Sequence, residues 1–347
     1  MSGTVRTVPS RRPGLVDLQV NGFAGHDVND DDVSAEVVVE LTRALWREGV
    51  TRYLPTIVTA GEEKILRALR AVAWAREADE HVAASIAGVH VEGPALSAAD
   101  GARGAHDLEH LRDPDPDELD RWQQASGGLV RIVTLAPERT GSAAYVAAAR
   151  ERGVLVSVGH TAATADVVRA AASAGASLAT HVGNGCQATL PRHPNHLWAI
   201  LAEDRLTAML IADGHHLPAD TLTAMIRAKS PERCILTSDS AALAGRPPGD
   251  YRTPVGGAVT VGDDGRLTLA GTSLLAGSGR SLRACLDWAR ATLPFDGDTL
   301  LAMATRNPAR VLGIEEMVRG DVVELEPDDG TARVVATTVA GREVFRA

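Results

Sequence analysis

The sequence alternates short runs of β-branched and other apolar residues with stretches whose apolar residues recur at helical spacing. This alternation predicts parallel strands joined by crossover helices. The predicted strands are Leu15–Val20, Tyr53–Val58, Ile86–Val91, Val130–Leu135, Leu155–Val158, Leu178–Thr180, Thr207–Ile211 and Ile235–Thr237. Eight strands are the number that a closed barrel requires, so the predicted fold class is α/β, a (β/α)8 TIM-like barrel.

Helical patterns lie between and after these strands. Val37, Leu41 and Leu45 fall on one helical face, and two later helices are predicted at Ser281–Leu293 and Asp298–Val311. A chain of 347 residues is long enough for such a barrel, which needs roughly 250 residues. The barrel therefore accounts for most of the chain.

The remaining sequence predicts turns and a small β appendage. Gly245–Gly279 is rich in glycine and turn residues, and the tail carries short strand patterns. These are Asp321–Glu324, Arg333–Val339 and Glu343–Phe345, with turns at Asp328-Asp329-Gly330 and Ala340-Gly341. The predicted organisation is a short N-terminal segment (1–12), the barrel (13–311) and the C-terminal part of a truncated β-sandwich appendage (312–347).

Charge and composition exclude several classes of function. The 35 basic and 45 acidic residues give a net charge of −10 without a basic block, which argues against a nucleic-acid partner. No apolar run approaches the roughly 18 residues of a membrane span, and the first residues lack an apolar signal core. We therefore expect a cytoplasmic protein without a membrane partner. Cys186, Cys234 and Cys285 are interpreted as buried small side chains, since they form neither a disulfide framework nor a C-x-x-C pair.

Four predicted strands end in a residue suited to metal or proton chemistry. Glu92, His160, His181 and Asp239 follow the third, fifth, sixth and eighth strands. In such barrels the carboxyl ends of the strands converge on one mouth, where active sites lie. Two imidazoles and a carboxylate can hold a divalent ion with one position open, and a separate carboxylate can act as general base.

These residues belong to a longer series of ordered segments. The segments are Pro13–Gly22, Glu92-Gly93-Pro94, Gly104–Asp107, Thr134–Glu138, Gly159–Thr164, Thr180–Asn184, Asp213–His216, Asp239 with Ala244-Gly245, Leu275–Ser278 and Asn307–Arg310. With them the chain resembles the metal-dependent amidohydrolase superfamily, and within it the N-acetylglucosamine-6-phosphate deacetylases, from Pro13 to about Ile314.

The resemblance implies a metal centre and a catalytic acid/base. Glu92, His160 and His181 would hold the metal, and Asp239 would be the catalytic residue. The superfamily places a His-x-His pair where this chain has Gln19-Val20-Asn21. Since neutral amides are weak metal ligands, we expect one divalent ion per chain, Zn²⁺ in preference to Fe²⁺ or another divalent ion.

The resemblance also implies a hydrolase of amino-sugar metabolism that removes the acetyl group of N-acetylglucosamine 6-phosphate. His106 and His216 would contact the sugar or the acyl carbonyl, and Asn184 would hold the distal substituent. Gln19 and Asn21 join this substrate-binding set. Arg192, reaching over from a partner subunit, would bind the phosphate, which implies a homodimer. His215 is interpreted as a solvated loop residue.

Four residues depart from the family pattern and keep alternatives open. Asn195 stands where the family has glycine, Leu197 and Trp198 where it tends to be small, and Arg280 where it is usually apolar. One alternative is the same chemistry on a different N-acyl substrate, without need of a phosphate. An alternative of another class is a non-catalytic sugar-binding barrel without metal.

Overall fold

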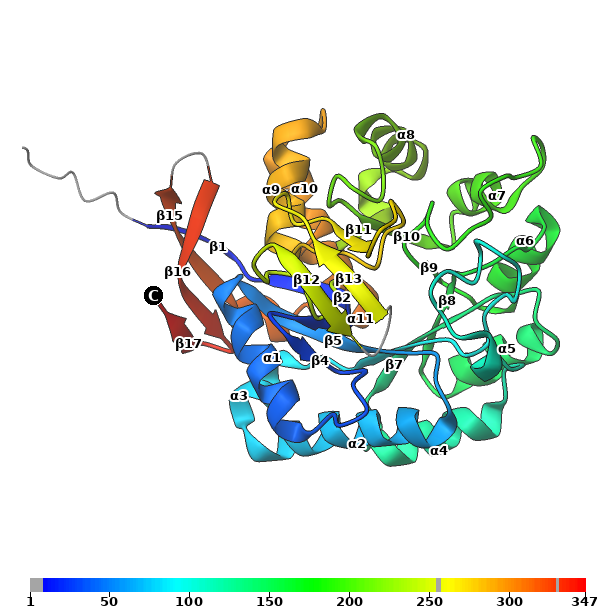
Figure 1. Cartoon of the computed structure of the whole chain (residues 1–347), viewed down its shortest axis with the longest axis horizontal. Helices are drawn as coiled ribbons and strands as arrows, with labels where there is room; N and C mark the ends of the chain where they lie inside the picture. Colours follow the sequence, from blue (N-terminus) through cyan, green and yellow to red (C-terminus); the bar gives the residue numbers. More distant parts are fainter. Residues whose placement is uncertain (1–8, 254–256, 329–330) are drawn as a thin grey trace, which may run out of the picture.

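The computed structural model describes residues 9–253, 257–328 and 331–347 (Figure 1). Its main sheet has eight parallel strands, and each strand after the first pairs with the one that precedes it in the barrel. They are β2 (Leu15–Val20), β5 (Val50–Val58), β6 (Val89–Glu92), β7 (Val130–Leu135), β8 (Leu155–Val158), β9 (Leu178–Ala179), β10 (Thr207–Ile211) and β11 (Cys234–Thr237). The predicted barrel is thereby confirmed, although β6 starts later than expected because Gly88, at φ 149°, interrupts the extended run.

Helices surround the strands (Figure 1). They are α1 (Ala35–Arg47), α2 (Glu62–Ala78), α3 (Glu80–Ser85), α4 (Pro116–Ser126), α5 (Ser142–Glu151), α6 (Ala165–Ala174), α7 (His196–Ala202), α8 (Ala219–Lys229), α9 (Leu282–Thr292), α10 (Gly297–Met303) and α11 (Arg306–Leu312), with 3-10 turns η1 (Leu108–His110), η2 (Pro231–Arg233) and η3 (Met317–Gly320). The buried face of α1 includes Leu41 and Leu45 as predicted, but Val38 rather than Val37. The single helix predicted at Asp298–Val311 is wrong. It is divided into α10 and α11, and Pro308 lies in the first turn of α11, where its missing N–H is tolerated.

A buried carboxylate joins the first and last strands of the barrel. Within the described residues no strand ladder connects β2 to β11, and only one isolated bridge, Val20 to Ser240, spans the seam. Asp17 on β2 accepts hydrogen bonds from Thr237 Oγ1 at 2.8 Å and from the backbone N–H and hydroxyl of Ser238. Burial raises the pKa of Asp17 to about 6 despite these bonds. Asp17 therefore closes the barrel directly beneath the loop that carries Asp239.

Two small antiparallel sheets lie outside the barrel, one after β11 and one after β2. The segment predicted as turns, Gly245–Gly279, contains a three-stranded antiparallel sheet of β12 (Gly249–Thr253), β13 (Gly257–Val261) and β14 (Leu267–Leu269), yellow in Figure 1. We call it the insert sheet. Val259, Val261 and Leu267 form its apolar cluster with Leu243, and this alternation was hidden by the surrounding glycines. A hairpin of β3 (Gly22–Phe23) and β4 (His26–Asp27) follows β2.

The appendage is one antiparallel sheet that lies beside α1, at the opposite end of the molecule from α5 and α6 (Figure 1). Its strands are β1 (Ser10–Pro13), β15 (Val322–Asp328), β16 (Thr331–Val339) and β17 (Arg342–Arg346). The tail strands occur near their predicted positions, and β1 adds a short N-terminal strand to the same sheet. Residues 329 and 330 of the predicted turn lie outside the described residues. A buried pair of Arg52 Nε and Asp321 Oδ2, 2.6 Å apart, links β5 to the start of β15.

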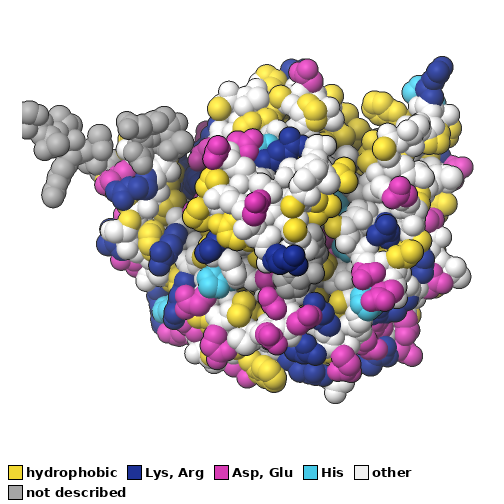
Figure 2. Space-filling view, in the orientation of Figure 1, with side chains coloured by type: hydrophobic (Ala, Val, Ile, Leu, Met, Phe, Trp, Pro, Cys, Tyr) yellow, Lys and Arg dark blue, Asp and Glu magenta, His cyan; other side chains and the backbone are white. Residues whose placement is uncertain are grey.

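The surface and the cysteines bear on the expectations drawn from charge and composition. Figure 2 shows acidic and basic side chains interspersed on the visible face, without a basic patch. Among the described helices, none has the length and apolarity needed to span a bilayer. All three cysteines are free; Cys234 and Cys285 are buried, but Cys186 is only half-buried, so its interpretation as a core residue is wrong.

Candidate active site

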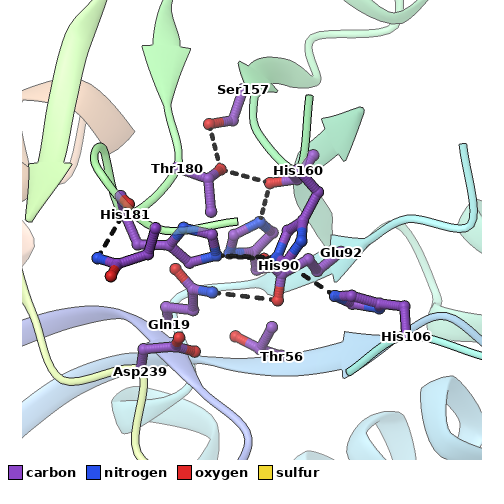
Figure 3. A network of polar contacts seen from close by, with 12 residues as sticks. Gln19, Thr56, His90, Glu92, His106, Ser157, His160, Thr180, His181 and Asp239 are labelled. Carbon is purple, nitrogen blue, oxygen red and sulfur yellow. Dashed lines mark hydrogen bonds and ion pairs between the residues drawn. The ribbon is translucent and has the colours of Figure 1, made fainter. Parts of the chain in front are cut away.

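The predicted chemical groups converge at the carboxyl ends of the barrel strands (Figure 3). Glu92 ends β6, while His160, His181 and Asp239 lie just beyond β8, β9 and β11. The last three have positive φ angles of 47°, 25° and 48°, which non-glycine residues rarely adopt. Such strain clusters at functional sites, and here it occurs at three strand ends whose side chains converge.

Glu92, His160 and His181 form a compact cluster of potential ligands. Glu92 Oε1 lies 3.2 Å from His160 Nε2 and 3.0 Å from His181 Nε2, and the two Nε2 atoms are 3.0 Å apart. Zinc–nitrogen bonds of about 2.0–2.1 Å in tetrahedral geometry separate ligand atoms by about 3.3 Å. The observed spacing therefore fits one shared divalent ion.

The surroundings of the cluster support the same interpretation. His160 Nδ1 lies 2.9 Å from the carbonyl oxygen of Ala102, which assigns its proton to Nδ1 and leaves the Nε2 lone pair facing the cluster. Burial raises the pKa of Glu92, but its close contacts with the His160 and His181 rings hold it well below its usual range. Burial lowers the pKa of His181, yet the Glu92 carboxylate raises it to about 8. The cluster thus holds an anionic carboxylate, which favours a cation.

His106 lies as close to this cluster as the predicted ligands do. Its Nε2 atom is 3.3 Å from His160 Nε2, and Glu92, His106 and His160 together meet the spacing of a metal-binding group. The ring is buried, and this burial lowers its pKa to about 3, so the imidazole is neutral. His106 can therefore bind the acyl carbonyl, as expected, or contribute a further nitrogen to the ion.

Gln19 and Asn21 occupy different positions relative to the cavity. Gln19 is fully buried and its Nε2 donates to Glu92 Oε2 at 3.1 Å, so its contact is with a candidate ligand rather than with the cavity. Asn21 lines the cavity and donates from Nδ2 to Asp239 Oδ1 at 2.8 Å. The carbonyl oxygens of both amides are buried without a partner among the described residues.

Asp239 is placed as a proton acceptor. Burial raises its pKa to about 7, and the charge of Glu92 adds to this effect. A carboxyl group that titrates near neutral pH can both take up and release a proton under working conditions. Asn21 holds Oδ1, which leaves Oδ2 for proton transfer.

A cavity of about 740 Å³ opens above these groups, a size typical of small-molecule sites. His216 and Asn184 line it, as predicted. His216 Nδ1 donates to Asp213 Oδ2 at 2.7 Å, which orients the ring and leaves Nε2 available. Burial raises the pKa of Asp213, but the hydrogen bonds from His216 lower it to about 2.

The interpretation of His215 as a solvated loop residue is wrong. Its side chain is only 12% exposed, and its Nε2 lies 3.4 Å from the carbonyl oxygen of Asp264, in the turn between β13 and β14. Arg280 donates from Nη2 to the same carbonyl at 3.2 Å. Both residues anchor the insert sheet, and Arg280 is not among the residues that line the cavity.

The segment around the predicted phosphate ligand lies outside the cavity. Arg192 is exposed and does not line the cavity of its own chain. Asn195 caps α7, because its Oδ1 accepts from the Trp198 N–H at 3.2 Å and its Nδ2 donates to the Pro191 carbonyl. Leu197 packs against the core and Trp198 is 57% exposed. None of these departures from the family pattern reshapes the cavity of this chain.

Two further residues of the site were missed by sequence reasoning. His90 is fully buried below Glu92, with Nε2 2.7 Å from Thr134 Oγ1, which in turn contacts Thr180 (Figure 3). Burial lowers its pKa to about 4, so it acts as a neutral support for the strands. His90 lies two residues before Glu92 on the same face of a strand, a signal that was available. Arg103, the second missed residue, lines the cavity.

Known proteins resemble this chain in sequence and in structure. The sequence pattern of the Amidohydrolase family matches residues 12–318. N-acetylgalactosamine-6-phosphate deacetylase of Escherichia coli O157:H7 is 35% identical over 319 residues, which cover 91% of this chain and 81% of that protein. N-acetylglucosamine-6-phosphate deacetylase of Bacillus subtilis (strain 168) is 32% identical over 304 residues, covering 87% and 75%.

A solved structure is similar over nearly the whole chain. It is an aspartate-to-alanine mutant of N-acetyl-D-glucosamine-6-phosphate deacetylase from Mycobacterium smegmatis, in complex with N-acetyl-D-glucosamine 6-phosphate. It is 33% identical, with a TM-score of 0.85, and the match covers 97% of this chain and 87% of that one.

Proposed function

The chain belongs to the amidohydrolase family, and on this premise we propose that it hydrolyses N-acetylglucosamine 6-phosphate to glucosamine 6-phosphate and acetate. The observation that carries the proposal is the convergence of Glu92, His160, His181 and Asp239 at the floor of one cavity. A non-catalytic barrel would not require a strained set of ligands beside a carboxyl group that titrates near neutral pH.

Glu92, His160 and His181 would hold one divalent ion per chain. Two imidazole nitrogens and a carboxylate favour Zn²⁺, with Fe²⁺ as the alternative. When bound, the ion would polarise the acyl carbonyl and acidify a water molecule. Gln19 fixes the orientation of the Glu92 carboxylate, so that one oxygen faces the two imidazoles.

Asp239 moves the proton that amide hydrolysis requires. Its free oxygen takes a proton from the attacking water and then delivers that proton to the departing amine. The pKa of about 7 suits both transfers, because neither protonation state is strongly favoured at neutral pH. The hydrogen bond from Asn21 keeps the carboxyl group in place during both steps.

The remaining cavity residues bind and orient the substrate. Because His216 Nδ1 donates to Asp213, its Nε2 atom is left as an acceptor, and this cavity-lining residue can accept a hydrogen bond from a sugar hydroxyl group. His106 offers a second neutral imidazole on the other side of the cluster. Asn184, which lines the cavity, would bind the distal part of the sugar.

Binding of the phosphate would involve a second copy of the chain. Arg192 is exposed and does not line the cavity of its own chain, which favours contact with a phosphate bound in a neighbouring subunit. We therefore propose a homodimer in which Arg192 binds the partner's substrate. Asn195 caps α7 and Arg280 anchors the insert sheet, so neither alters the cavity. The main reason to favour an unphosphorylated substrate is thereby removed.

A second candidate substrate is the C4 epimer, N-acetylgalactosamine 6-phosphate. It is favoured by the 35% identity to the Escherichia coli deacetylase for that sugar. The test is to measure kcat/KM for both N-acetylhexosamine 6-phosphates and both unphosphorylated sugars, with the metal content determined on the same sample. We expect a strong preference for phosphorylated N-acetylglucosamine and about one divalent ion per chain. Equal rates with and without the phosphate would overturn the substrate assignment.

A further inference from the structure

Two cationic side chains, Lys64 and Arg103, line the cavity within the described part of the chain, and they differ in their partners. Lys64 Nζ lies 2.6 Å from Asp31 Oδ1, so its charge is already paired. Arg103 has no carboxylate within ion-pair distance among the described residues. Its side chain makes one hydrogen bond there, from Nη1 to the His106 carbonyl at 2.9 Å, which leaves most of its donors free.

The loop that carries Arg103 is packed between the metal cluster and the segment after Asn184. The carbonyl of Ala102 accepts from His160 Nδ1, and a Cβ added to Gly104 would lie 3.1 Å from His160 Cε1. A Cβ added to Gly101 would lie 3.0 Å from the carbonyl oxygen of Cys186. These close approaches hold the backbone on both sides of Arg103, on the side of the cavity where Asn184 lies.

We propose that Arg103 determines specificity by binding the phosphate group of the substrate from within the same chain. The inference rests on the proposed function and adds a further residue that binds the phosphate of the substrate. A guanidinium group can grip a phosphate through two parallel hydrogen bonds. An unpaired arginine supplies local attraction for an anion in a chain whose net charge is −10. Arg103 and Arg192 would then hold the phosphate from two subunits.

The test compares kcat/KM for N-acetylglucosamine with and without its 6-phosphate in wild type and in Arg103→Gln. Loss of a hydrogen bond to a charged group predicts that the preference for the phosphorylated sugar falls about 10- to 100-fold. Arg103→Lys keeps the charge and should restore part of the preference. If Arg103 only positions His106, both substrates lose activity by the same factor and the preference is unchanged, which overturns the proposal.

Arg70→Gln is the matched control, since it removes the same charge from an exposed position on α2 outside the cavity. It should keep the wild-type preference. A second readout is calorimetric binding of inorganic phosphate, which should weaken about 10- to 100-fold in Arg103→Gln. Equal phosphate binding by the two proteins would overturn the role of Arg103, whereas absence of acetate release by metal-loaded wild type would overturn only the proposed function.

Discussion

The side-chain amide of Gln19 donates to Oε2 of Glu92 at 3.1 Å, while Oε1 of the same carboxylate faces the two imidazoles. Gln19 occupies the first position of the superfamily's His-x-His pair, but in this chain it orients a ligand. This relationship explains why a buried, neutral amide is retained at the bottom of the site.

Gln19→Leu should lower metal affinity without removing a ligand. Loss of a residue that orients a ligand typically weakens metal binding about 10- to 100-fold. Competition with a chelator, followed by elemental analysis, measures the effect. Asn21→Leu is the control, because Asn21 contacts Asp239 rather than Glu92, and its metal affinity should equal that of wild type. Equal affinities for Gln19→Leu and wild type would contradict the orienting role.

Asp17→Asn should change the pH dependence of stability. Because the folded state raises the pKa of Asp17 from 3.8 to about 6, it binds more protons there than the unfolded state does. Wild-type stability therefore falls as pH rises through this window, by roughly 3 kcal/mol in total, and asparagine removes that loss. Urea unfolding of metal-free samples, from about pH 4 to about pH 7, should show that the free energy of unfolding of the variant increases relative to that of wild type as pH rises. A pH-independent difference would show that Asp17 is not strained by burial.

Asn195→Gly should leave the preference for a phosphorylated sugar unchanged. The Asn195 side chain lies outside the cavity, where it caps α7 and donates to the Pro191 carbonyl, so its replacement should affect local stability rather than the cavity. Glycine should cost roughly 0.3 kcal/mol and alanine about 1 kcal/mol in the free energy of unfolding. Chemical denaturation and paired kcat/KM values for the two variants test this. A changed preference for the phosphorylated sugar would show that Asn195 reshapes the substrate pocket.

The fold was largely predictable because barrel strands are short, apolar and regularly spaced. All eight appear near their predicted positions, and the ends of four of them indicated the proposed ligand and base residues. The insert sheet was missed because its apolar positions, such as Val259 and Leu267, are few and separated by glycines. The split between α10 and α11 was missed, although a proline inside a helical pattern signals a helix boundary.

The site was less predictable where tertiary contacts decide a residue's role. The sequence suggested that Gln19 contacts substrate, but its strand position turns it toward Glu92. Asn195 and Arg280 suggested an altered pocket, yet one caps a helix and the other anchors the insert sheet. Arg103 carried no sequence signal, because its proposed role depends on a tertiary arrangement in which no carboxylate of the described residues lies within ion-pair distance of it.

The central claim is that the Glu92, His160 and His181 cluster and Asp239 form one hydrolytic site. The most direct test is to measure acetate released from N-acetylglucosamine 6-phosphate by metal-loaded wild type and Asp239→Asn, with the bound metal quantified in both. We predict turnover by wild type and a loss of about 100- to 10,000-fold in the variant at unchanged metal content. Equal acetate release by the two proteins would contradict the account.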